Sequence, residues 1–119
     1  MVSALLDTNL LIDYLQGNPH ALEEIGRYAQ PAISEITWME VMVGASPETE
    51  EGTRAFLLSF KRIAIDAAVA EQAVKLRKRY RLKLPDAIVW ATAQVHSLLF
   101  VTRDTKDFPI NEPGIRVPW

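Results

Sequence analysis

The chain has 119 residues, a length that corresponds to one domain with enough residues to bury a hydrophobic core. Hydrophobic residues make up 49% and charged residues 24%, as in folded globular proteins and unlike disordered ones. Cysteine is absent, which excludes disulfides, thiolate zinc sites and cysteine nucleophiles. The net charge of -2 excludes attraction of nucleic acid by overall charge, so such binding needs a basic patch or bound cations. We expect residues 1–119 to form a single domain.

The start of the chain does not have the pattern of a targeting signal. Asp7 and Asp13 interrupt its apolar residues, and no basic segment precedes them. Elsewhere, no stretch reaches the roughly 20 apolar residues that cross a bilayer. We therefore expect a soluble, cytoplasmic protein that does not enter a membrane.

Short apolar segments alternate along the chain with segments of helical periodicity. The first half is predicted as a strand at 2–6, helices at 9–15 and 20–29, a strand at 31–36 and a helix at 37–44 that ends at Gly44. The second half is predicted as a helix from Ser46 to about residue 60, a strand at 62–65, a helix from Asp66 to Tyr80, a helix at 84–97, a strand at 98–101 and an edge strand at 115–117. This alternation indicates an α/β fold with three layers, a central, mostly parallel sheet covered by helices on both faces.

Four acidic residues fall where such a sheet binds ligands, beyond the carboxyl ends of its strands. Asp7 directly follows the first predicted strand, Glu40 lies in the helix after the second, and Asp104 follows the strand at 98–101. Asp86 lies in the first turn of a helix that we expect to pack across the same edge. Because clustered carboxylates repel one another and are hard to desolvate, they need compensation, which Mg²⁺ or Mn²⁺ supplies. Such ions activate water and stabilise both oxygens of a phosphodiester that is being cleaved.

Each of these acids also has a purely structural interpretation. Asp7 could be the N-cap of the helix that follows it, and the pattern Thr37-x-x-Glu40 matches a capping box. Asp86 could simply complement a helix dipole, and Asp104 could stabilise a turn. These interpretations remain open at the level of the residues alone.

A dense basic stretch precedes Asp86. Six cations stand within nine residues: Lys75, Arg77, Lys78, Arg79, Arg81 and Lys83. They could form a solvated helix end that complements the dipole, or a track that contacts RNA phosphates and leads to the acids. Lys83 and Arg103 are nearest to the acids in sequence and are candidates for contact with a scissile phosphate.

Four segments around these acids resemble the motifs of PIN-domain ribonucleases, and specifically those of VapC-type toxins of toxin–antitoxin systems. The first is LLDTN, ending at Asn9, and the second is ISEITWME, ending at Glu40 and followed by Gly44. The third is LKLPDAIVWATA around Asp86, and the fourth is VTRDTKDF around Asp104. The motifs occur in order, at plausible spacing, and span nearly the whole chain.

The resemblance implies a PIN-like fold and a metal-dependent endoribonuclease that uses Mg²⁺ or Mn²⁺ and leaves a 5′-phosphate and a 3′-hydroxyl. It implies Asp7, Glu40, Asp86 and Asp104 as catalytic residues, with Asp7, Asp86 and Asp104 as the preferred metal ligands. Glu40 would ligate the metal or orient and deprotonate water. Asp107 is the alternative to Asp104 as the fourth acid, because some family members carry the acid nearer that end.

Two threonines beside these acids, Thr8 and Thr102, would support the site through their hydroxyls or merely cap the local backbone. Asn9 is interpreted as an ordinary helix-start residue. The resemblance further implies an RNA substrate, a cognate antitoxin that inserts a segment into the acidic groove, and a homodimer. Tyr14, Leu15 and the helix at 48–60 are candidates for either protein contact.

Two other functions compete with this one. The segment DTN superficially resembles the start of aspartate phosphatases, but those need a second acid two residues after the first, where this chain has Asn9. A catalytically silent PIN-like module that binds RNA or protein is the second, and the complete set of acids argues against it.

Overall fold

The computed structural model describes residues 3–119, which form a five-stranded sheet in the order β3-β2-β1-β4-β5. The strands are β1 (Ala4–Leu6), β2 (Ala32–Ser34), β3 (Lys61–Ile63), β4 (Leu99–Val101) and β5 (Ile115–Arg116). All of the neighbouring strand pairs are parallel. The predicted α/β class with a parallel central sheet is therefore confirmed, while Val2 of the first predicted strand lies outside the described residues.

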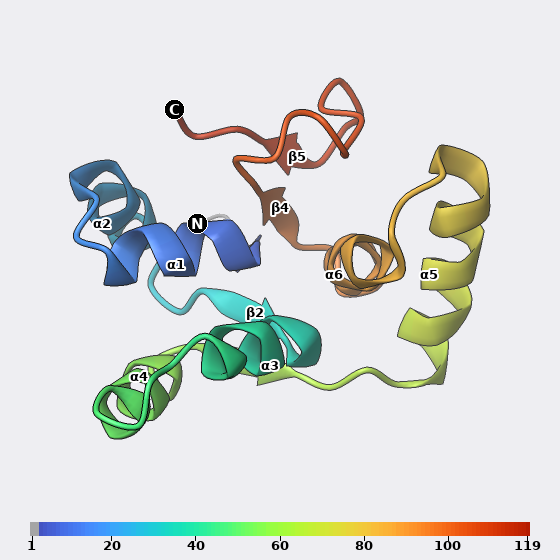
Figure 1. Ribbon diagram of the computed structural model, residues 1–119. Helices are drawn as coiled ribbons and strands as arrows, with labels where there is room; N and C mark the ends of the chain where they lie inside the picture. Colours follow the sequence, from blue (N-terminus) through green and yellow to red (C-terminus); the bar gives the residue numbers. More distant parts are fainter. Residues whose placement is uncertain (1–2) are drawn as a thin grey trace.

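Helices connect the successive strands from β1 to β4, whereas the loop at 102–114 connects β4 to its parallel neighbour β5. The helices are α1 (Thr8–Leu15), α2 (Pro19–Gly26), α3 (Glu35–Val43), α4 (Glu50–Leu57), α5 (Ala67–Tyr80) and α6 (Leu84–Val95). In Figure 1, α5 and α6 lie to the right of the sheet and α1, α2 and α4 to its left, which gives the three layers that were expected. No helix within residues 3–119 combines the length and the apolar character that crossing a membrane demands.

Alternate residues of each strand point to opposite faces of the sheet, so the two faces have separate cores. Leu5 and Phe100 pack on the α5–α6 side, whereas Leu6 and Val101 pack on the side of α1, α3 and α4. All four side chains are fully buried. Because β1 and β4 are covered on both faces, they form the rigid centre of the molecule.

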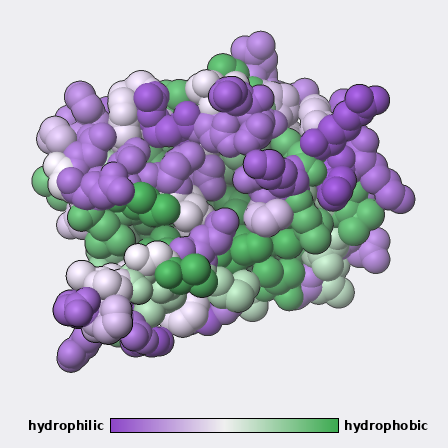
Figure 2. All heavy atoms as spheres, viewed as in Figure 1, coloured by the Kyte–Doolittle hydropathy of each residue, from purple (hydrophilic) through white to green (hydrophobic). Residues whose placement is uncertain are grey.

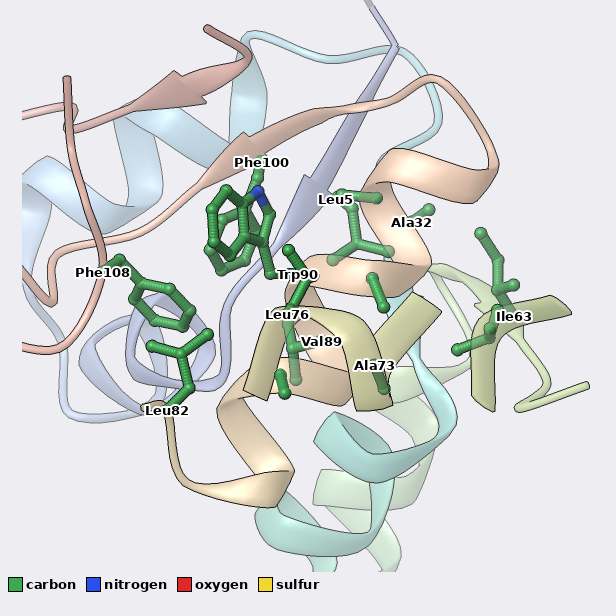
Figure 3. Packing of buried hydrophobic residues seen from close by; sticks show 14 residues of the cluster. Leu5, Ala32, Ile63, Ala73, Leu76, Leu82, Val89, Trp90, Phe100 and Phe108 are labelled. Carbon is green, nitrogen blue, oxygen red and sulfur yellow. The ribbon is translucent and has the colours of Figure 1, made fainter. Parts of the chain in front are cut away.

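Aromatic rings fill the α6 side of this core. The Phe108 ring lies edge-on to Phe100, with ring centroids 4.9 Å apart, and edge-on to Trp90, with centroids 6.2 Å apart. Figure 3 shows these three rings together between the sheet and the helices. Phe108 lies in the loop after β4, so its burial holds the preceding residues of that loop against α6.

Two helices, α3 and α4, begin more than one residue away from their predicted starts. The Ser34 hydroxyl accepts the Ile36 N–H at 3.3 Å and caps α3, so the helix starts at Glu35 and the predicted strand at 31–36 ends at Ser34. Thr37 is thus inside α3, and the capping-box interpretation of Thr37 and Glu40 is wrong.

The predicted helix from Ser46 starts late because its first residues form a separate turn. The Ser46 N–H donates to Thr49 Oγ1 at 2.9 Å, and α4 begins only at Glu50. The other elements form where predicted, with shifted ends. For example, α6 stops at Val95, because Ser97 adopts a left-handed conformation with φ of 55° and Leu98 N–H donates to the Ala93 carbonyl at 2.8 Å.

A buried ion pair fastens the last strand to the helix layer. Glu24 of α2 is only 3% exposed and accepts Arg116 Nε at 2.8 Å and Arg116 Nη2 at 2.9 Å. Its carboxylate also accepts the Tyr28 hydroxyl at 2.7 Å and pairs with Arg27 at 3.1 Å. The hydrogen bonds from Arg116 are the main reason that the pKa of Glu24 is lowered. Edge strand β5 is therefore held by the ion pair of Arg116 with Glu24 as well as by its backbone hydrogen bonds to β4.

Glu24→Gln should lower the free energy of unfolding by about 2–3 kcal/mol, because it leaves the partly buried Arg116 without its counter-charge. Glu50→Gln, which breaks the exposed pair with Arg54, is the matched control and should cost less than about 1 kcal/mol. Because the folded pKa of Glu24 is lowered, its stabilisation is present above the unfolded pKa and is lost as pH falls. Urea unfolding at neutral and acidic pH measures both effects. Equal losses in the two variants would contradict this role for Glu24.

Candidate active site

The direction in which strands are added to the sheet reverses at its centre. From β1 the chain proceeds outward to β2 and β3, then returns to β4 on the other side of β1. The point of reversal lies between β1 and β4, with α1 following β1 and the loop at 102–114 following β4. Open α/β sheets bind ligands at the carboxyl ends of their strands at such a point. Asp7 directly follows β1, and Thr102 directly follows β4.

Asp7 lies at this point of reversal, directly after β1. It is the N-cap of α1, and its Oδ1 accepts the Thr8 N–H at 2.8 Å, so the capping interpretation is correct as far as it goes. Its Oδ2 accepts the Thr102 hydroxyl at 2.7 Å and the Asn9 side-chain amide at 3.3 Å. Its backbone N–H extends the β1–β4 ladder to the Val101 carbonyl at 2.9 Å. The carboxylate is therefore fixed from both central strands.

The environment of Asp7 disfavours its ionised form. The side chain is buried, with 6% of the residue exposed. This burial is the main cause that raises the pKa of Asp7 to about 6, and the negative charges of Asp86 and Asp104 act in the same direction. The hydrogen bonds from Thr102 and Thr8 oppose the increase. A buried carboxylate whose nearest charged neighbours are also acids is in a position that favours a bound cation.

Three further acids lie at the same end of the sheet as Asp7. One carboxylate oxygen from each of Asp86, Asp104 and Asp107 lies within 4.8 Å of the others. Asp86 lies in the first turn of α6 and is half-buried. Partial burial is the main cause of its raised pKa, followed by the charges of Asp104, Asp107 and Glu40, while Lys83 acts in the opposite direction. The first turn of α6 thus brings Asp86 to the loop after β4, as expected.

Asp104 has both of the functions considered for it, in the turn and in the acid cluster. Its Oδ1 accepts the N–H groups of Lys106 and Asp107 at 3.1 and 3.0 Å, which stabilises the turn. Its own N–H donates to the Thr102 hydroxyl at 3.0 Å. Its negative charge also contributes to the raised pKa of both Asp7 and Asp86. Asp107 is more exposed, and its charge contributes to the raised pKa of Asp86 but not to that of Asp7, so Asp104 is the more central of the two.

Glu40 approaches the same site from α3. Its Oε1 accepts the Thr8 hydroxyl at 2.8 Å, and its charge contributes to the raised pKa of Asp86. Its side chain is exposed, unlike that of Asp7. The structure therefore brings all four predicted acids, together with Asp107, to one end of the sheet.

The donor set suits a hard divalent cation. Carboxylate oxygens are the ligands that Mg²⁺ and Mn²⁺ prefer, and partial exposure leaves room for the waters that these ions retain. None of the ion pairs within residues 3–119 involves Asp7, Asp86 or Asp104. The negative charge of the cluster is thus not neutralised by salt bridges in the described part of the protein.

The predicted phosphate-binding residues lie at different places around the acids. Arg77 and Arg79 are in the last turn of α5 and are exposed. Figure 2 shows hydrophilic side chains protruding at the upper right, where this end of α5 lies in Figure 1. Lys83, the N-cap residue of α6, is close enough to influence Asp86. The guanidinium of Arg103 instead lies over the Trp119 ring, 5.0 Å from its centroid.

A groove of about 460 Å³ runs beside Glu40. Ile12 and Leu15 of α1 line one side, and Val41 and Gly44 of α3 line another. Ile12 and Leu15 are 39% and 45% exposed, which is high for large apolar side chains. Tyr14 is not free for contact in the same way, because its ring stacks on Phe56 of α4 at a centroid distance of 4.7 Å.

Comparison with known families identifies this arrangement. The model of the PIN domain matches residues 4–110. The chain belongs to the PIN-domain family. The resemblance seen in the sequence motifs is thus confirmed over most of the chain, although a search of curated proteins finds no match.

Solved PIN-like structures share the whole fold of this PIN domain. A toxin–antitoxin complex from Klebsiella pneumoniae contains a chain that is 50% identical, with a TM-score of 0.93 over 98% of both chains. DNA-bound VapBC from Salmonella typhimurium is 25% identical, with a TM-score of 0.78 over 98% of this chain and 96% of that one. FitAcB from Neisseria gonorrhoeae is 24% identical, with a TM-score of 0.82 over 98% of both chains, a likeness of fold alone.

Two residues at the site of this PIN domain have contacts that sequence reasoning did not anticipate. Asn9 does more than start a helix, because its amide donates to Asp7 and its Oδ1 accepts the Arg103 N–H at 3.4 Å. Thr37 is fully buried, with its Oγ1 3.0 Å from the hydroxyl of Thr8. The position of Asn9, two residues after Asp7, could have predicted its hydrogen bond to the Asp7 carboxylate. The contact of Thr37 with α1 had no signal in the linear sequence.

Asp7→Asn should make metal-free protein more stable relative to the wild type as pH rises from about 4 to about 6. A folded pKa of about 6, above the unfolded value of 3.8, means that folding favours the protonated carboxyl. The wild type therefore loses stability as Asp7 ionises, by roughly 2–3 kcal/mol once pH exceeds the folded pKa, whereas asparagine stays neutral. Urea unfolding of both proteins in EDTA across this range measures the difference. A difference that does not change with pH would contradict the assignment.

Proposed function

We propose that this PIN domain is a metal-dependent endoribonuclease that hydrolyses RNA phosphodiesters and is the toxin of a toxin–antitoxin pair. The observation that carries the proposal is the convergence of Asp7, Glu40, Asp86 and Asp104 at the centre of the sheet without salt-bridge partners in the described residues. Family membership supports nuclease chemistry in general.

The acids would have different catalytic roles, set by how buried each one is and by its hydrogen bonds. Asp7, Asp86 and Asp104 would hold Mg²⁺ or Mn²⁺, since Asp7 is buried and fixed and the charges of the other two act on it. Bound there, the cation would offset the charge that develops on the phosphate and would make water a better nucleophile. Glu40, which is exposed and held by Thr8, would orient the attacking water and accept its proton. Thr102 keeps the Asp7 carboxylate in place.

The basic end of α5 would guide RNA toward the acids. Arg77 and Arg79 are exposed in its last turn, and Lys83 stands between them and Asp86 along the chain. Phosphate contacts of this kind give a protein of net charge -2 a local surface for a polyanion. Arg103, held over Trp119, would act at the rim rather than among the acids.

Similarity to solved complexes supports the toxin part of the proposal. The structure that is 50% identical is described as a toxin–antitoxin complex. In this chain, Glu40 also lines the groove formed by Ile12 and Leu15, so an antitoxin segment lying in it would reach this acid. A basic side chain of that segment would then occupy the place of the cation. We also propose that the protein forms a homodimer in the cell, as the family resemblance implies.

RNA cleavage should require Mg²⁺ or Mn²⁺ and should stop in EDTA. Asp7→Asn should reduce the rate by more than about 100-fold, the upper range for loss of a group that only supports a metal ligand. Asp13→Asn, the same substitution farther along α1, is the control and should cleave like the wild type. Cleavage of labelled RNA and identification of the product ends measure both. Full activity of Asp7→Asn, or in EDTA, would refute the mechanism, and RNA binding without any cleavage would favour the silent module.

Charge reversal at Arg77 or Arg79 should weaken RNA binding and make it less sensitive to salt. Each lost contact with a single-stranded phosphate should reduce the slope of log K against log salt by about 0.7. Lys61→Glu is the control, because Lys61 is the first residue of β3 and so lies at the amino ends of the parallel strands, whereas the acids lie beyond the carboxyl ends. Fluorescence anisotropy in the Asp7→Asn background, where RNA stays intact, measures the slopes. An unchanged slope in both arginine variants would remove α5 from the RNA path.

A further inference from the structure

Thr37 is the buried member of a chain of three side chains that ends at Glu40. Its residue is 0% exposed, and its Oγ1 lies 3.0 Å from the Thr8 hydroxyl. The same Thr8 hydroxyl lies 2.8 Å from Glu40 Oε1. Thr37 and Glu40 are one helical turn apart on α3, and both reach Thr8 at the start of α1.

The chemistry of the three groups fixes the direction of the hydrogen bonds. A hydroxyl has one proton, and an ionised carboxylate can only accept. The Thr8 hydroxyl is placed to donate to either oxygen, but its single proton serves only one of them. When that proton goes to Glu40, the proton between the two threonines has to come from Thr37. The resulting order is Thr37 to Thr8 to Glu40, in which each bond polarises the next.

The start of α3 explains why Thr37 is available to donate. A threonine inside a helix commonly donates to the carbonyl four residues earlier, as Thr92 of α6 does to Ile88 at 2.7 Å. For Thr37 that carbonyl belongs to Ile33, which lies in β2, before the helix begins. Within residues 3–119, Thr8 is the side-chain partner of Thr37.

Glu40 needs such support more than the other acids do. Its side chain is exposed on a helix, where a free glutamate samples several rotamers. Asp7, by contrast, is held directly by the buried hydroxyl of Thr102 at 2.7 Å. Thr37 and Thr102 thus anchor two different acids of the site, Glu40 through an intermediate hydroxyl and Asp7 directly.

We propose that Thr37 is a positioning residue for the proposed RNA cleavage, fixing the Glu40 carboxylate through the Thr8 hydroxyl. The inference rests on the proposed function, in which Glu40 orients the attacking water. Thr37 itself touches neither the acids nor the substrate. Its loss should therefore lower the rate of the chemical step without changing how RNA binds.

Thr37→Val should lower kcat by about 3- to 10-fold, the loss expected for one hydrogen bond, and should leave KM unchanged. Thr37→Ser, which keeps the hydroxyl, should restore kcat. Thr8→Val should lower kcat at least as much, and the double variant should be no slower than Thr8→Val, because Thr37 acts through Thr8. Thr92→Val, which removes an equally buried hydroxyl from α6, controls for loss of stability and should keep its kcat. Thermal unfolding verifies that each variant is folded.

Crystal structures of the wild type, Thr37→Val and Thr37→Ser test the same chain independently of activity. Glu40 should stay within hydrogen-bond distance of Thr8 in the wild type and in Thr37→Ser, and should leave it or become disordered in Thr37→Val. An unmoved Glu40 in Thr37→Val, a wild-type kcat, no rescue by serine, or losses that add in the double variant would each overturn the inference. Absence of RNA cleavage by the wild type would instead refute the proposed function, while the structures still decide whether Thr37 holds Glu40.

Discussion

The desolvated carboxylate of Asp7 is the constraint on which the rest of the site depends. An acid with 6% exposure and a pKa raised to about 6 destabilises the fold unless something compensates it. Hydrogen bonds from Thr8 and Thr102 compensate in part, but they satisfy the oxygens without neutralising the charge. Asp86 and Asp104 add negative charge close to Asp7. The folded protein therefore carries uncompensated negative charge at this site, which a bound cation would neutralise.

The sheet topology is what forces this juxtaposition. β1 and β4 are neighbours although they lie far apart in the sequence, and both are buried on two faces, so their ends have little freedom to separate. Residues immediately beyond them, Asp7 and Thr102, must therefore meet. The loop after β4 is also restrained, because the Phe108 ring in this loop packs against Phe100 and Trp90. Asp104 is thus held between two fixed points, the end of β4 and the aromatic core.

Alternating apolar and amphipathic segments were sufficient to predict the layers, the parallel sheet and the edge at which the acids gather. The same pattern did not predict which of several short polar residues caps a given helix. Ser34 and Thr37 can both cap a helix, and only the tertiary packing of β2 decides in favour of Ser34. The contact between Thr37 and Thr8 joins residues from different elements, so no periodicity within one segment reveals it. Asp104 and Asp107 share one loop turn, which is why spacing alone left the fourth acid open.

The partners of the acids are hydroxyls and amides, while the nearby arginines are engaged elsewhere. The Arg116 guanidinium is bound to Glu24, and that of Arg103 lies over Trp119. Lys83 is the cation whose charge lowers the pKa of Asp86, and it is exposed at the N-cap position of α6. A lysine or arginine paired with Asp7 would neutralise the site permanently and leave no attraction for a metal. Fixing the acids with neutral donors such as Thr102 keeps their geometry and preserves their charge, so the affinity for an external positive group is built in when the protein folds.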